Sequence, residues 1–282
     1  MGYIDLHVHS TASDGSLSPA QLVQYACEKG LYAFALTDHD SVAGISAARK
    51  AAENYPVKVI PGVEISSALG SKSIHILGYY IDYEDSRFLR SLHQISRSRD
   101  ERNIKICAQL RSYGIDIDYE SFRAQTGCRM ITRNHFAFYL IAQGYVSSRM
   151  EAFEKYLAKG RPCYIPLQYP ATSDVVRLIR NAGGTAVLAH PIQYRMTDKG
   201  YIQLFTLVKT FGVKGVEAIY SDHTPEEEQK FRSIAASLGM FVTGGSDFHG
   251  ALKPEIDLGT GRGNIMIPQS LLDNLRRANT PQ

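Results

Sequence analysis

Two histidines separated by one residue stand near the start of the chain, in the segment DLHVHSTASDG at positions 5–15. His7 and His9 end an apolar, strand-like run, and Asp14 follows in a loop rich in serine, threonine and glycine. Because residues i and i+2 of an extended chain point to the same side, both imidazoles can converge on one ion. Imidazole and carboxylate together suit a divalent metal. On its own, the pair is equally typical of surface histidines in a loop.

The same pattern recurs along the chain, which favours the metal interpretation. Apolar strand-like runs lie near residues 3, 32, 57, 73, 185, 215 and 240, with helical patterns between most of them. Each run except the sixth carries metal-capable side chains, namely His7, His9, Asp38, His39, Asp40, Glu64, His75, His190, Asp247 and His249. Six of the nine histidines in the chain belong to this set, whereas structural histidines would be scattered over helices and loops.

Alternating strands and helices are typical of a parallel α/β sheet. The first helix is well marked, with Ser18 as its N-cap, Pro19 at its first position and Gly30 as its stop. Further helices are predicted over residues 42–54, 172–181, 202–211, 225–238 and 268–277. Residues 86–161 contain no convincing strand. We therefore predict a closed β/α (TIM-like) barrel with one missing or irregular unit, formed by residues 1–85 and 162–282, and an inserted helical cap subdomain, 86–161, for substrate recognition.

Composition narrows the class of protein further. The 282 residues are 44% hydrophobic, yet no apolar run is long enough to span a bilayer, so no membrane partner is expected. Because the chain enters its first strand almost at once, it leaves no room for a signal peptide, and we expect a cytoplasmic protein. The cysteines lack CxxC spacing, which argues against a zinc knuckle or a disulfide framework. They are Cys27, Cys107, Cys128 and Cys163.

Five segments occur in an order that resembles the polymerase and histidinol phosphatase (PHP) family of metal-dependent phosphoesterases. They are DLHVHS at 5–10, LTDHD at 36–40, PGVEIS at 61–66, AHP at 189–191 and GGSDFHG at 244–250. The resemblance covers nearly the whole chain. It implies a distorted seven-stranded β/α barrel that carries three divalent metal ions.

Carried over by position, the resemblance implies three sets of metal ligands. The first set is His7, His9, Glu64 and Asp247, the second is Glu64, His75 and His190, and the third is Asp14, His39 and His249. Glu64 would bridge two ions, and the first set would form the catalytic centre. Bound divalent ions lower the pKa of water and neutralise phosphoryl charge. The carboxylate of Asp14 favours manganese or magnesium over zinc, with Mn²⁺ as the first expectation and iron, zinc or magnesium as alternatives.

Substrate recognition is assigned to the insertion and the barrel rim. The segment RNHFA at 133–137 resembles part of the insertion in nucleotide phosphatases of the family, which implies phosphate binding by Arg133 and His135. Arg195 is a candidate to form a bidentate pair with a second phosphate group. His223 is a candidate catalytic acid for the leaving ribose oxygen, or a phosphate ligand; the alternative is a solvent-exposed loop histidine.

Two further features of the sequence bear on the site. Asp5 and Asp38 are candidates to accept the second N–H of ligand histidines, or else to cap strand ends. Basic residues are concentrated at the start of the insertion, as a phosphate-binding or a merely solvated helix face. They are Arg87, Arg90, Arg97, Arg99, Arg102, Lys105 and Arg111.

The predicted activity is removal of the 3′-phosphate from nucleoside 3′,5′-bisphosphates, together with 5′-to-3′ trimming of short 5′-phosphorylated RNA. The alternative substrate is another small phosphomonoester, such as histidinol phosphate or a sugar phosphate. In the histidinol phosphatase branch a histidine takes the place of Asp14, so Asp14 argues against this alternative. A non-catalytic interaction module is the second alternative, but it predicts broken ligand sets, and here all nine positions are filled. No stable duplex nucleic-acid partner is expected, and the oligomeric state stays open.

Overall fold

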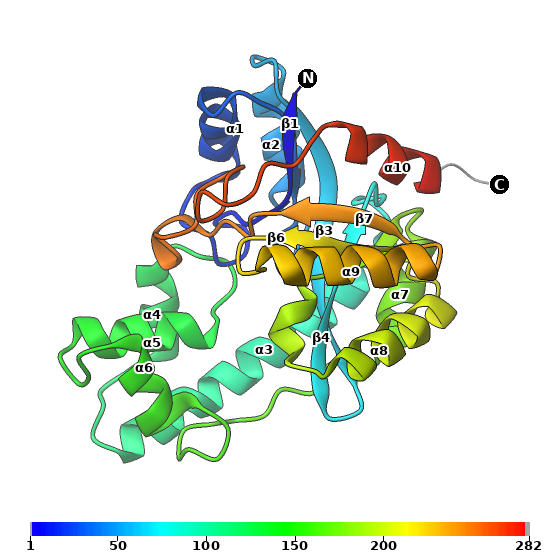
Figure 1. The fold of residues 1–282 in the computed structure, drawn as a ribbon. Coiled ribbons are helices and arrows are strands. Elements are labelled where there is room, and N and C mark those ends of the chain that lie inside the picture. The colour runs from blue at the N-terminus through cyan, green and yellow to red at the C-terminus, as the bar shows by residue number, and fades with distance from the viewer. Residues whose placement is uncertain (1, 280–282) are drawn as a thin grey trace.

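The computed structural model describes residues 2–279. Its centre is one seven-stranded sheet in which each strand pairs with its neighbours in chain order (Figure 1). The strands are β1 (Tyr3–Val8), β2 (Leu31–Leu36), β3 (Lys58–Leu69), β4 (Lys72–Tyr79), β5 (Thr185–Leu188), β6 (Gly215–Tyr220) and β7 (Phe241–Gly245). The seven predicted strands and the α/β class are confirmed.

The sheet is nearly closed into a barrel because the segment after β7 returns to β1. Val8 forms a parallel bridge with Phe248. The backbone N–H of Asp247 donates to His7 at 2.9 Å, and that of His9 donates to Phe248 at 3.0 Å. These bonds bring the first and the last predicted metal ligands together at one rim.

The prediction of an entirely parallel sheet is wrong at β4. This strand runs antiparallel to both β3 and β5. Only Gly70 and Ser71 separate β3 from β4, and Gly70 has a φ of +59°, so the two strands form a tight hairpin that has no room for a crossover helix. As a consequence, His75 lies within a strand rather than beyond its end, and it pairs with Ser66 across the hairpin.

Helices cover the outside of the barrel. In the first of them, α1 (Pro19–Glu28), the side chain of Ser18 accepts a hydrogen bond from the backbone of Gln21, so the predicted N-cap is confirmed. The remaining barrel helices are α2 (Ile45–Ala52), α7 (Thr172–Asn181), α8 (Asp198–Phe211), α9 (Pro225–Ser237) and α10 (Ser270–Asn279). One apolar cluster packs helices against strands, and a second, which includes Ile4, Leu6 and Val187, fills the barrel.

A helical insertion extends from one end of the sheet between β4 and β5 (Figure 1, teal to green). It contains α3 (Ser86–Ser112), α4 (Tyr119–Thr126), α5 (Arg133–Ala142), α6 (Arg149–Ala152) and a π-helical turn, Phe153–Leu157. Its buried apolar side chains form a cluster of their own that runs from Ile106 to Cys163. We call this helical region the cap.

Two predictions from composition concern membranes and cysteines. Across residues 2–279, none of the helices combines the length and the apolar character that crossing a lipid bilayer requires. The four cysteines are free thiols, and Cys107 and Cys163 are buried in the core of the cap.

Candidate metal centre and substrate pocket

The nine predicted metal ligands converge at the end of the barrel that faces the cap, around Glu64 of β3. One carboxylate oxygen of Glu64, Oε1, lies 2.7 Å from His75 Nδ1 and 2.8 Å from His190 Nε2. The other, Oε2, lies 3.1 Å from His7 Nε2 and 3.0 Å from His39 Nδ1. A single buried carboxylate therefore contacts histidines that come from four different strands or strand ends.

Three groups of side chains have donor atoms within 4.8 Å of one another. The groups are His7, His9, Glu64 and Asp247; His9, Asp14, His39 and His249; and His39, Glu64 and His75. The first has the members expected for the first metal, and the second adds His9 to those expected for the third. The last group contains His39 where His190 was expected, although His190 and His75 contact the same oxygen of Glu64.

The chemistry of these groups fits divalent metal ions. Among the described residues, both ring nitrogens of His9 are buried without a hydrogen-bond partner, and Nε2 lies 3.3 Å from a carboxylate oxygen of Glu64 and of Asp247. Buried polar atoms are usually paired, so unpaired imidazole nitrogens beside carboxylates fit a site that binds a cation. Imidazole and carboxylate oxygen are ligands that manganese, iron and zinc accept.

The charge state of the carboxyl groups supports the same interpretation. Burial raises the pKa of Glu64, but the charges of His39, His7 and His75 outweigh it and hold that pKa well below its usual range. The same competition holds the pKa of Asp14 well below normal, through His249 and His39. Buried carboxyl groups that stay ionised attract cations.

Glu217 is a functional residue that the sequence analysis missed. The sixth strand was expected to contribute nothing, yet Glu217 is fully buried in β6. Its Oε1 lies 3.0 Å from His7 Nδ1, and its Oε2 accepts the backbone N–H of His190 at 2.8 Å. Glu217 therefore holds Nδ1 of His7, which leaves Nε2 facing Glu64. The signal was a glutamate inside the apolar run GVEAI.

Asp5 and Asp38 do not hold ligand imidazoles. Asp5 accepts from the backbone of Ser246 at 2.9 Å and of Gly259 at 2.8 Å. Asp38 accepts from the backbone and the hydroxyl of Ser10, both at 2.7 Å. The alternative interpretation is therefore confirmed, because both carboxylates cap the backbone and hydroxyl groups around the strand ends.

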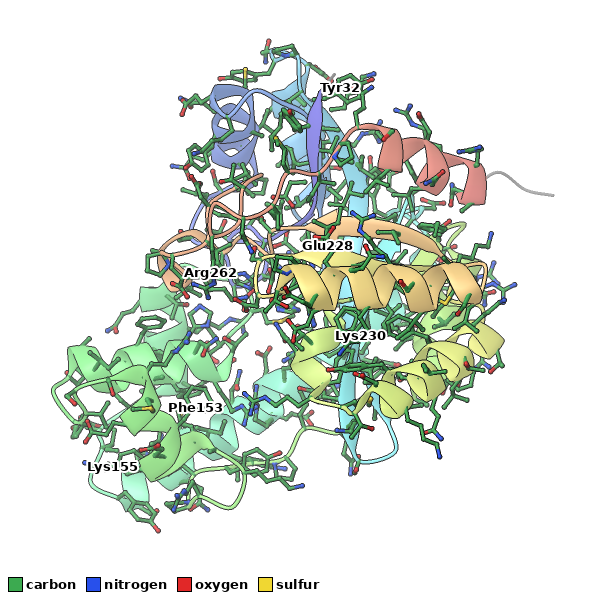
Figure 2. All side chains as sticks on the ribbon, in the orientation of Figure 1. Tyr32, Phe153, Lys155, Glu228, Lys230 and Arg262 are labelled. Carbon is green, nitrogen blue, oxygen red and sulfur yellow. The ribbon has the colours of Figure 1, made fainter. Side chains whose placement is uncertain are left out.

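A cavity of about 490 Å³ opens beside the predicted ligands, and the barrel rim and the cap both line it. From the barrel come Asp14, His39, His75, His190 and His249, and from the cap and the chain that follows it come Arg99, Arg102, Arg133, Phe153, Tyr164 and Tyr169. Figure 2 shows Phe153 on the cap and Tyr32, at the start of β2, at the opposite end of the barrel. The cavity therefore lies where the parallel strands end, which is the usual place for chemistry in such barrels.

The three arginines of the cavity differ in their partners. Arg99 is paired, since its Nε and Nη2 bind Asp40 at 2.8 and 2.6 Å. Arg102 is only 6% exposed and forms no ion pair or hydrogen bond with the described residues. Burial and the charge of Arg99 lower its pKa to about 10, which still leaves it charged at neutral pH. Arg133 has one hydrogen bond, to the carbonyl of Leu157 at 3.2 Å.

His135 lies near the cavity but does not line it. Thr132 is the N-cap of α5, and its backbone N–H donates to His135 Nδ1 at 3.0 Å. The neutral ring must therefore carry its proton on Nε2. That nitrogen is buried without a partner among the described residues.

Arg195 is not where the sequence predicted it. Its side chain is exposed and lines a separate groove with Met196 and Leu204. The 3₁₀ turn Pro191–Tyr194 explains the difference, because Tyr194 turns into the cavity while Arg195 leaves the turn at a φ of +48°. Arg195 is not among the residues that line the cavity beside the candidate ligands, and its phosphate contact stays a prediction.

His223 lies in neither predicted position. It is 6% exposed rather than solvated, and its ring packs on Tyr220 and Phe231 at centroid distances of 5.2 and 4.9 Å. Its Nδ1 donates to the carbonyl of Ala218 at 2.7 Å, and it lines a small cavity beside Asn264. This cavity is not the one that the metal-ligand candidates line, and the role of His223 as catalytic acid stays a prediction.

Comparison with known proteins tests the family assignment. The family model described as "PHP domain" matches residues 5–169, which is more than half of the chain. The chain belongs to the PHP family. This PHP protein is 36% identical over 245 residues to a 5′-3′ exoribonuclease of Haemophilus influenzae, covering 87% of the chain and 89% of the relative.

Two further relatives match nearly the full PHP chain. A 3′,5′-nucleoside bisphosphate phosphatase of Chromobacterium violaceum is 34% identical, covering 92% of the chain and 91% of the relative. The structure of an amidohydrolase from the same organism, with bound sulfate and no metal, superposes with a TM-score of 0.86 at 32% identity and covers 98% of this chain and 96% of that one. The barrel and the cap therefore both have counterparts in these relatives.

Proposed function

We propose that this protein is a metal-dependent phosphoesterase that removes the 3′-phosphate of nucleoside 3′,5′-bisphosphates, such as adenosine 3′,5′-bisphosphate, and trims short 5′-phosphorylated RNA from its 5′ end. The observation that carries the proposal is that one cavity joins the metal-ligand cluster to two arginines, Arg102 and Arg133, that have no carboxylate partner among residues 2–279. Relatives named for these two activities match most of the chain.

The nine clustered histidines and carboxylates would hold three divalent ions, with Mn²⁺ as the first expectation because Asp14 adds a hard oxygen ligand. When bound, these ions lower the pKa of water and neutralise charge on the phosphoryl group. The protein supplies the alignment of the ligands. Glu217 holds Nδ1 of His7, and Asp5 and Asp38 fix the strand ends that carry the ligands.

Arg102 and Arg133 bind the second phosphate, at the end of the cavity away from the cluster. Both side chains line the cavity, and both guanidinium groups keep free N–H donors. Arginine forms paired, charge-assisted hydrogen bonds with phosphate, so two of them give a strong preference for a doubly phosphorylated substrate. His135 lies next to this cavity without lining it, and its unpaired Nε2 keeps it a candidate for the same phosphate.

The nucleoside lies between the two phosphates, against aromatic side chains of the cap and of the chain that follows it. Phe153, Tyr164 and Tyr169 line the same cavity. The guanidinium of Arg133 lies 5.4 Å from the ring centre of Tyr164, and that of Arg99 lies 5.7 Å from the ring centre of Tyr169. Aromatic rings support bases by stacking whatever the base sequence, which suits an enzyme that acts on many nucleotides.

The test is phosphate release with Mn²⁺ from three substrates side by side: adenosine 3′,5′-bisphosphate, a 5′-phosphorylated RNA of a few nucleotides, and histidinol phosphate. We expect the bisphosphate and the RNA to be turned over and histidinol phosphate to be poor. A preference for histidinol phosphate, or no turnover of any nucleotide, would contradict the proposal.

Substitution of Arg133 by alanine separates recognition from chemistry. We expect a loss of about tenfold or more in kcat/KM on adenosine 3′,5′-bisphosphate, since charged hydrogen bonds contribute about 1.5–3 kcal/mol. Turnover of p-nitrophenyl phosphate, which has one phosphate, should change little. Equal losses on both substrates would show that Arg133 does not hold the second phosphate.

A further inference from the structure

The two carboxylate oxygens of Asp247 face different surroundings. Oδ1 lies 3.3 Å from His9 Nε2 and 3.6 Å from His7 Nε2, on the side of the metal-ligand cluster. Oδ2 accepts a hydrogen bond from Lys253 Nζ at 2.6 Å and another from the hydroxyl of Tyr220 at 2.9 Å. Lys253 and Tyr220 therefore hold the same oxygen of the same candidate ligand.

Lys253 and Tyr220 differ in their access to the cavity. Tyr220 is 1% exposed, is not among the residues that line the cavity, and accepts a further hydrogen bond from Gln193 at 2.6 Å. The side chain of Lys253 is 21% exposed and lines the cavity together with Asp14 and His249. Of these two side chains, only that of Lys253 can contact a molecule bound in the cavity.

The ammonium of Lys253 has donors to spare. It carries three N–H groups. One binds Asp247, and no other hydrogen bond to the described residues exists. Because Tyr220 already secures Oδ2, orientation of Asp247 does not by itself require a lysine. A cation beside a carboxylate ligand, with free donors in the cavity, matches a phosphoryl oxygen that lies next to the cluster.

We propose that Lys253 is a substrate-binding residue whose ammonium binds a non-bridging oxygen of the phosphate to be cleaved, while Asp247 holds it in place. This inference rests on the proposed function, since it deepens the description of the same site. It divides the cations of the cavity into two sets. Lys253 serves the scissile phosphate at the barrel rim, and Arg102 and Arg133 serve the second phosphate at the cap.

The test compares two substitutions that each remove one donor to Oδ2, Lys253→Met and Tyr220→Phe, in the full-length, metal-loaded protein. Metal content is measured by elemental analysis. Affinity for inorganic phosphate is measured by calorimetry and by competitive inhibition of p-nitrophenyl phosphate turnover. We expect both variants to keep their metals, Lys253→Met to bind phosphate about tenfold more weakly, and Tyr220→Phe to stay within about twofold of wild type.

Lys253→Arg keeps the cation and should bind phosphate more tightly than Lys253→Met. Equal phosphate affinities in Lys253→Met and Tyr220→Phe, or loss of metal from Lys253→Met alone, would overturn the proposal and leave Lys253 as a positioning residue for Asp247. Wild-type protein that binds phosphate through Lys253 but hydrolyses no phosphate ester would contradict the proposed function and not this assignment.

Discussion

The barrel wall and the cap wall of the cavity differ in whether their charged side chains are paired with one another. On the barrel wall, charged groups contact one another, as Glu64 contacts the rings of His7, His39, His75 and His190 within 3.1 Å. On the cap wall, Arg102 has no partner among the described residues. These charges fit cations at the barrel wall and an anion at the cap wall. We therefore propose that the chemistry takes place on the barrel and that the cap selects the substrate.

One ion pair joins the two walls. Arg99 of α3 binds Asp40 through two nitrogens and donates to Ser66 Oγ at 2.8 Å. Asp40 directly follows the candidate ligand His39 and has a φ of +46°, so its backbone is held in a conformation that non-glycine residues rarely adopt. Arg99 thus links the cap to the loop that carries His39, a candidate metal ligand.

The largest effect is expected from Glu64→Gln, which tests the role of the barrel wall. This change keeps the shape of the side chain but removes the charge that the cluster shares. We expect kcat to fall by about a thousandfold or more on every substrate, together with loss of metal. A steady-state assay and elemental analysis of the purified variant measure both effects. Unchanged metal content together with wild-type turnover would show that the barrel wall takes no part in the reaction.

Next in size is Arg102→Met, which tests the cap wall. Loss of an unpaired, buried cation should reduce kcat/KM for adenosine 3′,5′-bisphosphate by about tenfold to a hundredfold and leave p-nitrophenyl phosphate nearly unaffected. The matched control is Arg97→Met on the same helix, because that side chain is 83% exposed and paired with Glu101. Similar losses in both variants would mean that the net charge of the cap matters, and not Arg102 itself.

A loss of about tenfold to a hundredfold in metal affinity or kcat is expected from Glu217→Gln, with the same loss on singly and doubly phosphorylated substrates. The physical reason is that Glu217 touches His7 and the backbone of His190 but does not line the cavity. Titration of the metal-free protein with Mn²⁺ and kinetics on both substrates provide the measurement. A loss confined to bisphosphates would show that a barrel residue also selects the substrate.

The smallest effect is expected from Arg195→Ala, which should leave kcat/KM for the bisphosphate within about twofold of wild type, as for surface substitutions away from the site. Its side chain is exposed in a groove apart from the cavity. The measurement is kcat/KM on adenosine 3′,5′-bisphosphate for the wild type and the variant. A tenfold loss would restore the sequence-based assignment of Arg195 to phosphate binding.

Residues whose role depends on strand position were predictable from the sequence. The seven strands and the convergence of nine candidate ligands followed from apolar runs that end in histidine or carboxylate. The antiparallel β4 was missed because strand count and apolar pattern do not reveal direction, although the short connection at Gly70 carried that information. Glu217 was not predicted because it lies inside the apolar strand β6, whereas the candidate ligands were sought among residues that follow a strand.

Residues whose role depends on how the cap docks were not predictable individually. Seven basic side chains mark the segment 87–111, and only the orientation of α3 against the barrel separates buried Arg99 and Arg102 from exposed Arg97. The same limit applies to two predicted substrate-site residues that do not line the cavity beside the candidate ligands. Arg195 and His223 occupy loops, where one turn residue decides whether the side chain enters the cavity.

We propose that the barrel cleaves one phosphate of the substrate while the cap binds the other. The most direct test measures kcat/KM of the Mn²⁺-loaded protein on adenosine 3′,5′-bisphosphate and on adenosine 3′-phosphate, which lacks only the second phosphate, in wild type and in a protein carrying both Arg102→Met and Arg133→Met. We predict a wild-type preference for the bisphosphate of about a hundredfold, and a ratio near one in the double variant. A wild-type ratio near one, or a ratio that the double substitution leaves unchanged, would contradict the account.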